Sequence, residues 1–154
     1  MSTPTHDPRD RAYMEQAIQC AEESIPAPQA YCVGAVLVTT DGTVTTGYSR
    51  ELPGNTHAEE CALAKLPKTQ SARGATMYTT MEPCSERLSG NRPCTSRLLE
   101  AQVARVVVGV REPPNLVAQC TGLDQLREAG IEVVFVPGVE EACLKPNRHI
   151  LDKQ

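Results

Sequence analysis

Two stretches decide how this chain folds: residues 57–66 read HAEECALAKL and residues 75–84 read ATMYTTMEPC. The first is typical of a helix that a proline ends, and the second of a buried strand that runs into a Glu-Pro-Cys turn. A helix followed by a buried strand is the repeating unit of α/β folds. Each stretch also carries a metal-binding residue type, since His57 opens the first and Cys84 ends the second.

Upstream of these stretches the sequence predicts a helix and a hairpin. The helix begins near Asp7, which can cap it, and ends before Pro26. Residues 33–40 form a nearly continuous apolar run, and Asp41-Gly42 after it is typical of a tight hairpin turn. Residues 43–50 alternate as a returning strand, so we expect the sheet to begin with an antiparallel pair.

Downstream, helices and strands are expected to alternate. The predicted elements are a helix at Pro93–Ala101, a strand at Ala104–Val110, a helix at Gly122–Ala129, a strand at Ile131–Val136 and a last helix that starts at Val139–Leu144 and is interrupted or ends before Pro146. This order predicts a three-layer α/β/α fold, with a mixed sheet of about five strands and helices on both faces. We expect residues 1–154 to form a single domain, with residues 1–7 and 147–154 as peripheral tails.

Composition argues against several classes of partner. The formal net charge is −4, from 15 basic and 19 acidic residues, so a basic face for nucleic acid is not expected. The seven cysteines are an odd number and the first residues are polar, which favours reduced thiols in the cytoplasm over a secreted disulfide framework. No apolar run reaches the length of a membrane span. We therefore predict a cytoplasmic protein without nucleic-acid or membrane partners.

The residues that carry chemistry form a split cluster. His57, Cys84 and Cys94 offer one nitrogen and two sulfur donors, which is the inventory of a catalytic zinc site with an open fourth position. Each cysteine follows a proline at or just before an expected helix start, where backbone N–H groups favour the thiolate. Glu59 lies two residues after His57 and is spare, as in zinc deaminases whose glutamate moves protons. We predict one catalytic Zn²⁺ per chain and Glu59 as the catalytic residue.

Simpler interpretations exist for each part of this cluster. Thr56 and Glu59 match a helix capping box, with Thr56 as the cap. The two loop cysteines could be buried apolar residues. Cys61 lies four residues after His57 on the same helix face and could compete as a ligand. The joint pattern is more specific than any of its parts, so catalytic zinc remains the favoured interpretation.

The order of elements and the His-Ala-Glu and Glu-Pro-Cys motifs resemble the cytidine deaminase superfamily across nearly the whole chain. Within it, residues 31–38, 57–63 and 79–94 resemble the fungal pyrimidine deaminases of riboflavin biosynthesis. The resemblance implies a cytidine-deaminase-like fold, a homodimer and hydrolytic release of ammonia. The implied substrate is a small phosphorylated ribitylaminopyrimidine, 2,5-diamino-6-(ribitylamino)-4(3H)-pyrimidinone 5′-phosphate.

The same resemblance implies zinc on His57, Cys84 and Cys94, with Glu59 as the proton shuttle. One departure is the nine residues between the two cysteines, where the common deaminase signature has two. The related bacterial domains also have a long spacer, but their Pro-Asn-Pro before the first strand is missing here, and the spacer lacks their histidine and is one residue longer. Bacterial substrate contacts therefore do not carry over, and we expect specificity to lie in this spacer.

Substrate contacts are expected from the spacer and from residues beside the metal ligands. The predicted contacts are Asn55, Ala58, Glu82, Ser85, Arg87, Ser89, Gly90, Asn91 and Arg92. Arg87 or Arg92 could hold a phosphate through paired hydrogen bonds, or be a solvated loop charge. Asn55 could bind the ring or shape the turn into the helix. The tail at residues 145–154, with His149, could fold over a pocket, although an exposed tail is favoured.

Two other functions compete with this hypothesis. The first is a deaminase of another free pyrimidine or nucleotide, such as cytosine, cytidine or dCMP, or of a base in tRNA or DNA. The acidic balance and the low aromatic content argue against a surface for stacking nucleic-acid bases. The second is a catalytically silent module that zinc stabilises.

Overall fold

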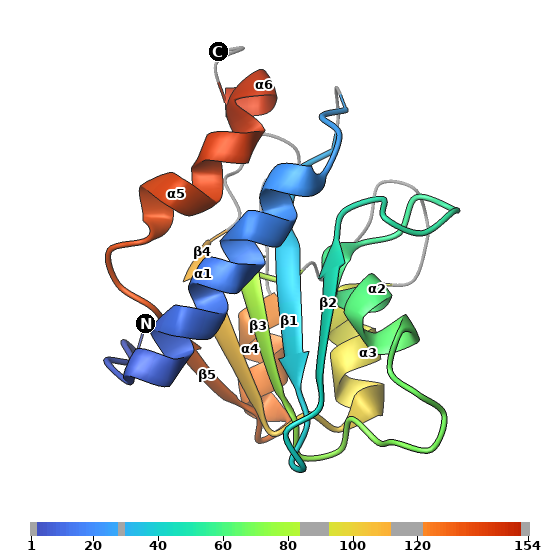
Figure 1. The fold of residues 1–154 in the computed structure, drawn as a ribbon. Coiled ribbons are helices and arrows are strands. Elements are labelled where there is room, and N and C mark those ends of the chain that lie inside the picture. Colours follow the sequence, from blue (N-terminus) through green and yellow to red (C-terminus); the bar gives the residue numbers. More distant parts are fainter. Residues whose placement is uncertain (1–2, 28–29, 84–92, 112–121, 152–154) are drawn as a thin grey trace.

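The computed structural model of the chain, drawn in Figure 1, describes residues 3–27, 30–83, 93–111 and 122–151. Its elements along the sequence are α1 (Pro8–Glu23), β1 (Gly34–Val38), β2 (Val44–Tyr48), α2 (Ala58–Ala64), β3 (Thr76–Met81), α3 (Cys94–Ala101), β4 (Arg105–Val110), α4 (Gly122–Glu128), β5 (Glu132–Phe135), α5 (Glu140–Leu144), the 3₁₀ helix η1 (Lys145–Asn147) and α6 (Arg148–Leu151). The alternation of helices and strands predicted from the sequence is confirmed.

The five strands form one mixed sheet in the order β2-β1-β3-β4-β5. β1 pairs antiparallel with both β2 and β3, whereas β3, β4 and β5 run parallel. The β1–β2 connection is the expected hairpin, in which Gly42 has a φ of 89° that suits glycine. The predicted three-layer fold with about five strands is therefore confirmed.

Side chains of each strand alternate between two cores. On one face, Ala35 and Leu37 of β1 pack with α2, α3 and α4. On the other face, Val36 of β1 and Val107 of β4 pack with α1 and α5. Figure 1 shows α1 in front of the sheet and α4 behind it. None of the helices among the described residues has the length and apolar character that a bilayer span requires.

The close approach of β2 to α2 fixes where α2 begins. A Cβ atom on Gly47 would lie 2.2 Å from the carbonyl oxygen of Ala58 and 2.7 Å from the amide nitrogen of Ala62. Only glycine allows the helix backbone to lie this close to the strand. This contact sets the position of the first turn of α2, and with it that of His57, which precedes the helix.

The two ends of the chain differ from the predicted peripheral tails. In the N-terminal segment, the amide of Phe135 donates to the carbonyl of Thr3 at 2.8 Å, and the amide of Thr5 donates to the carbonyl of Phe135 at 2.8 Å. These bonds form a parallel bridge between Pro4 and β5. The edge of β5 offers unpaired backbone groups, and residues 3–5 satisfy some of them.

The described part of the C-terminal segment stays helical to Leu151, past the point where the last helix was predicted to be interrupted or to end. Pro146 lies in the first turn of η1, where proline is tolerated, so it does not end the helical segment. Asn147 is fully buried; its side chain accepts from the amide of Cys32 at 2.5 Å and donates to the carbonyl of Cys32 at 3.1 Å. His149 lies 3.1 Å from the carbonyl oxygen of Ala30. The prediction of a peripheral tail is therefore wrong for residues 147–151.

A buried ion pair joins the helix layer to the sheet. Asp10 of α1 is almost fully buried and accepts two hydrogen bonds from the guanidinium of Arg105 in β4, at 2.8 and 2.6 Å. The hydroxyls of Tyr78 and Thr5 also donate to its carboxylate, at 2.9 and 2.7 Å. Arg105 makes a further bond of 2.7 Å with Glu132. The carboxylate is thus fully satisfied in a site where an unpaired charge would be costly.

We predict that Asp10→Asn lowers the free energy of unfolding by about 3 kcal/mol, because it removes one charge of a buried pair. Urea denaturation at neutral pH measures the loss. Glu132→Gln is the control: its side chain is 61% exposed, so breaking its bond to Arg105 is expected to cost no more than about 0.5 kcal/mol. Equal losses in the two variants would contradict the assigned role of Asp10.

The same group gives the stability a pH dependence. Burial raises the pKa of Asp10, but the bonds from Arg105, Thr5 and Tyr78 outweigh burial and lower the pKa to about 2. Because this pKa lies below the ordinary value, the carboxylate stabilises the fold fully above about pH 4, and the stabilisation disappears as the pH falls toward 2. Asp10→Asn should show a shallower loss of stability over this range, and an unchanged slope would exclude Asp10 as its source.

Candidate metal and catalytic site

The predicted site residues gather at one edge of the sheet. β1 is antiparallel to β3, so the carboxyl end of β3 lies beside the start of β1. α2 begins at this edge, after His57 as its N-cap residue, because Gly47 at the same end of β2 contacts its first turn. α3 begins with Cys94, which is fully buried. The edge therefore collects the starts of two helices and the end of the central strand.

Two of the three predicted metal ligands are adjacent. The Sγ atom of Cys94 lies 3.3 Å from the Nδ1 atom of His57. Nitrogen and sulfur ligands of a tetrahedral zinc ion are about 3.5 Å apart, so this pair fits the ion. Among the residues that the structure describes, no third histidine, cysteine or acid completes a metal-binding group. The third predicted ligand, Cys84, lies outside the described residues.

Glu59 is held against the central strand. It lies in the first turn of α2 and is only 3% exposed. The hydroxyl of Thr79, in β3, lies 3.1 Å from Oε2 of Glu59 and 2.9 Å from the carbonyl oxygen of Met81, and both of these atoms can accept its proton. A carboxylate that is mostly buried and held by a neighbouring hydroxyl can act as a general acid or base.

The capping pattern of α2 differs from the alternative considered for Thr56 and Glu59. The N-cap residue is His57, and its amide donates to Oε1 of Glu60 at 3.2 Å. Thr56 instead closes the preceding loop, with its hydroxyl donating to the carbonyl of Leu52 at 2.8 Å. The capping box predicted for Thr56 and Glu59 is therefore wrong: it is formed one residue later, by His57 and Glu60. The prediction missed it because threonine is a common N-cap residue and histidine is an unusual one. Glu59 is thereby left for the buried side of the helix.

Cys61 is placed away from the pair of donors. Its thiol donates to the hydroxyl of Thr56 at 3.1 Å, beneath the loop that leads into α2. The sulfur that lies beside His57 belongs to Cys94. The arrangement therefore favours Cys94 over Cys61 as the partner of His57.

The start of α3 is tightly packed on its other side. A Cβ atom on Gly122, the first residue of α4, would lie 2.3 Å from the carbonyl oxygen of Pro83 and 2.8 Å from Oγ1 of Thr95. The end of β3 and the starts of α3 and α4 thus meet without room for a side chain. This contact fixes both ends of the segment that connects β3 to α3.

The structure places three of the predicted substrate contacts. Asn55 is exposed in the loop before α2, and its φ of 58° is a left-handed conformation that asparagine tolerates. Ala58 is buried with its side chain in the core, and Glu82 is buried with its amide bonded to the carbonyl of Val110 at 2.9 Å. The contacts predicted for Ser85, Arg87, Ser89, Gly90, Asn91 and Arg92 lie outside the described residues. Substrate binding by all nine stays a prediction.

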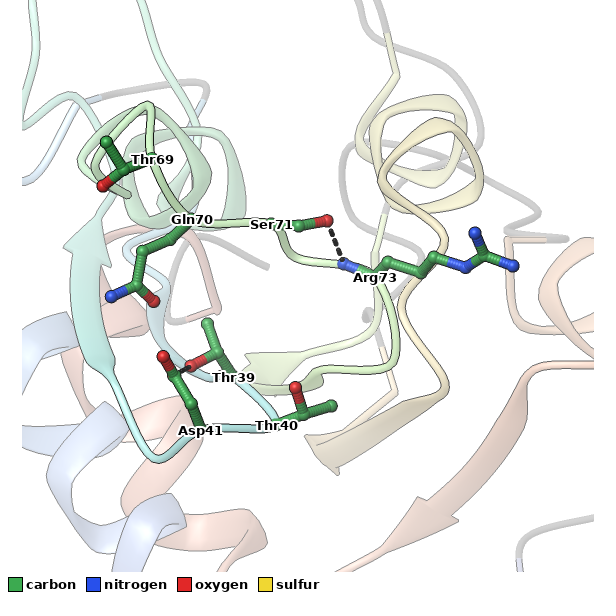
Figure 2. A pocket seen from close by; sticks show the side chains of 7 residues that line it. All are labelled: Thr39, Thr40, Asp41, Thr69, Gln70, Ser71 and Arg73. Atoms are coloured by element: carbon green, nitrogen blue, oxygen red, sulfur yellow. Dashed lines mark hydrogen bonds between the residues drawn. The ribbon is translucent and has the colours of Figure 1, made fainter.

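A polar hollow of about 270 Å³ lies at the opposite end of the sheet, between the β1–β2 turn and the segment before β3. Figure 2 shows its lining residues: Thr39, Thr40, Asp41, Thr69, Gln70, Ser71 and Arg73. Two of these groups bond within the lining, since the amide of Arg73 donates to the hydroxyl of Ser71 at 3.1 Å. The lining contains no histidine or cysteine, so this hollow is not the metal site.

Three residues at the site were missed in the sequence: Thr79, Glu60 and Gly122. Alternation along the strand could have indicated that Thr79 faces α2, but not which helical residue it meets. Glu60 could have been predicted by placing the N-cap of the capping box at His57 and not at Thr56. The sequence carries no local signal for Gly122, because its neighbours Pro83 and Thr95 are distant in the chain.

Comparison with known proteins places this geometry in a family. Residues 7–110 match the family described as the cytidine and deoxycytidylate deaminase zinc-binding region. A diaminohydroxyphosphoribosylamino-pyrimidine deaminase from Schizosaccharomyces pombe is 46% identical over 136 residues, which cover 86% of this chain and 33% of the relative. This chain spans about a third of the length of the curated relatives that it matches.

Solved structures give the same result. The Rib2 deaminase of Aspergillus oryzae, in a C-terminal deletion mutant, is 33% identical with a TM-score of 0.77, and the match covers 89% of each chain. A second structure of this Rib2 deaminase, in complex with DARIPP, is 31% identical with a TM-score of 0.71 and covers 94% of this chain and 99% of that one. With its donor pair and buried glutamate at the same edge of this fold, the chain belongs to the zinc-binding cytidine and deoxycytidylate deaminase family.

Proposed function

We propose that this chain is a zinc-dependent deaminase of riboflavin biosynthesis, acting on 2,5-diamino-6-(ribitylamino)-4(3H)-pyrimidinone 5′-phosphate. The observation that carries the proposal is the pair His57 Nδ1 and Cys94 Sγ, 3.3 Å apart at the starts of two helices. The donor chemistry is that of catalytic zinc, with Cys84 as the third ligand and one ion per chain. Bound zinc would supply Lewis-acid activation of water at neutral pH.

Glu59 is the proposed proton carrier. Its carboxylate accepts a proton from the attacking water and delivers it to the ring nitrogen next to the amine-bearing carbon. The carbon–oxygen bond forms in this step. The hydroxyl that results then gives up its proton, which passes through Glu59 to the amine, and the carbon–nitrogen bond breaks as the carbonyl forms. The products are ammonia and the corresponding pyrimidinedione.

Thr79 orients this carrier. Its hydroxyl lies within hydrogen-bond distance of both Oε2 of Glu59 and the carbonyl of Met81, at the end of the central strand. Thr79 is fully buried, so its hydroxyl has few alternative partners. The contact selects one rotamer of Glu59, and proton transfer depends on such positioning to within a fraction of an ångström.

The choice of substrate rests on similarity and on the spacer. The Schizosaccharomyces relative is named for a phosphoribosylamino-pyrimidine, and the Rib2 deaminase has been solved with DARIPP. The spacer between Cys84 and Cys94 contains two arginines that suit a phosphate. We choose the ribityl form because residues 31–38, 57–63 and 79–94 resemble the fungal pyrimidine deaminases. The name of the Schizosaccharomyces relative points to the ribosyl form, so the assay must include both.

We predict that the purified chain with zinc releases ammonia from the ribitylaminopyrimidine phosphate, and that Glu59→Ala lowers the rate by about 1,000-fold. The variant should keep the zinc content of the wild type, because the glutamate is not a ligand. Ammonia release and metal analysis on the same samples measure both effects. Glu140→Gln, which changes an exposed carboxylate on α5, is the control and should leave the rate unchanged.

The assay should include competing substrates. Turnover of cytosine, cytidine or dCMP without turnover of the ribitylaminopyrimidine would remove the substrate assignment and keep the reaction class. Faster turnover of the ribosylamino form would reverse the proposed preference. Loss of zinc and of folding together in Glu59→Ala would make Glu59 a structural residue.

Thr79→Val, which keeps the shape of the side chain and removes the hydroxyl, should lower kcat about tenfold with little change in KM. Thr79→Ser should recover most of kcat, because it restores the donor. Steady-state kinetics on the three proteins separates the two constants. A change confined to KM, or an inactive serine variant, would contradict the orienting role.

A further inference from the structure

The spacing of the two cysteines poses a structural problem for a metal site. Where only two residues separate them, as in the common deaminase signature, the short connection itself keeps the two sulfurs together. Here nine residues separate Cys84 from Cys94, and a segment of this length restricts the distance between its ends far less. The position of Cys94 relative to His57 must then be maintained by contacts of α3 with the rest of the fold, among them its contacts with α2, which His57 precedes.

One carboxylate makes such a contact. Oε1 of Glu60 accepts from the amide of His57 at 3.2 Å, and Oε2 of Glu60 pairs with Nη2 of Arg97 at 3.1 Å. Arg97 lies in α3, three residues after Cys94. Glu60 therefore joins the backbone of one metal-ligand candidate to the helix that begins with the other, and α2 and α3 are also in contact.

The surroundings of the Glu60–Arg97 ion pair strengthen its constraint on the position of α3. The side chains of Arg97 and Glu60 are 28% and 18% exposed, so solvent screens the ion pair only in part. On the opposite side, the close contacts of Gly122 with Pro83 and Thr95 hold the start of α3 against β3 and α4. Leu98 anchors the middle of α3 in the core. The Glu60–Arg97 pair supplies the constraint toward α2 among these described contacts.

We propose that Glu60 and Arg97 are positioning residues that hold His57 and Cys94 at ligand separation and thereby set the affinity of the zinc site. The inference rests on the zinc site of the proposed function. The Glu60–Arg97 ion pair would then set the zinc affinity and not only contribute to the stability of the fold.

Zinc affinity tests the proposal directly. The variants are Arg97→Met, which removes the ion pair from the α3 side, and Glu60→Gln, which can still accept from the amide of His57 but carries no charge. We expect each to weaken zinc binding by about 10-fold to 100-fold. The double variant should bind zinc with about the same affinity as the single variant that binds it less tightly, because both changes remove the same interaction.

The chain offers a matched control on the same helix. Lys65 and Glu51 form an ion pair of 2.7 Å, with side chains 33% and 21% exposed, at the other end of α2. Lys65→Met should change the zinc affinity by less than about twofold. Arg97→Lys, which keeps the charge at a different geometry, should recover part of the affinity.

The measurement is competition with a chromophoric chelator at fixed pH and salt, together with the melting temperature of the zinc-free proteins. If the wild-type chain binds zinc and both single variants bind it equally well, the positioning role is wrong and the proposed function stands. Equal losses in Arg97→Met and Lys65→Met would also overturn it. A wild-type chain that binds no zinc would overturn the zinc site and the positioning role together. Since the two variants lie on different helices, Arg97→Met carries the test if Glu60→Gln does not fold.

Discussion

The register of β3 is the constraint on which the rest of the structure depends. Three consecutive residues of this central strand each fix a different part of the molecule. Tyr78 donates to Asp10 on the α1 face, Thr79 contacts Glu59 on the α2 face, and Thr80 accepts from the amide of Gly34 in β1. Because side chains alternate along a strand, a slip by one residue would exchange the two faces. The stabilising ion pair and the buried glutamate are thus set by one alignment.

Much of this arrangement could be predicted from the sequence, because its signals are local. The turn at Asp41-Gly42, the prolines that end helices and the apolar runs predicted the alternation and the mixed sheet. The motif that begins with His57 and the two Pro-Cys pairs predicted which residues meet at one edge, and the structure brings His57 and Cys94 together. The alternation and the His57–Cys94 contact could be predicted because the chemistry of a residue and its place in an element are both visible in a few neighbouring positions. The place of Cys84 stays a prediction, since it lies outside the described residues.

The remainder depends on pairs of residues that are far apart in the chain. Asn147 is polar and follows a proline, so its sequence is typical of an exposed tail; it is buried because the backbone of Cys32 offers it a donor and an acceptor. The bridge from Pro4 to β5 depends in the same way on an open sheet edge that the strand order creates. Thr79 and Glu59 are twenty residues apart, and neither residue alone indicates the other. Local patterns cannot specify such pairs, because each becomes visible only once the sheet order is known.

The long spacer between the cysteines shows the difference between local sequence patterns and contacts of residues that are distant in the chain. A short spacer would encode the geometry of the metal site within the chain itself, where a motif can show it. With nine residues between the sulfurs, the geometry depends on tertiary contacts: Gly122 against Pro83 and Thr95 on one side, and Glu60 with Arg97 on the other. These contacts join described residues that lie outside the spacer, so the residues proposed to hold His57 and Cys94 in place are not the spacer residues that are expected to bind the substrate. The residues proposed to carry out the reaction are thereby separate in the fold from those expected to select the substrate.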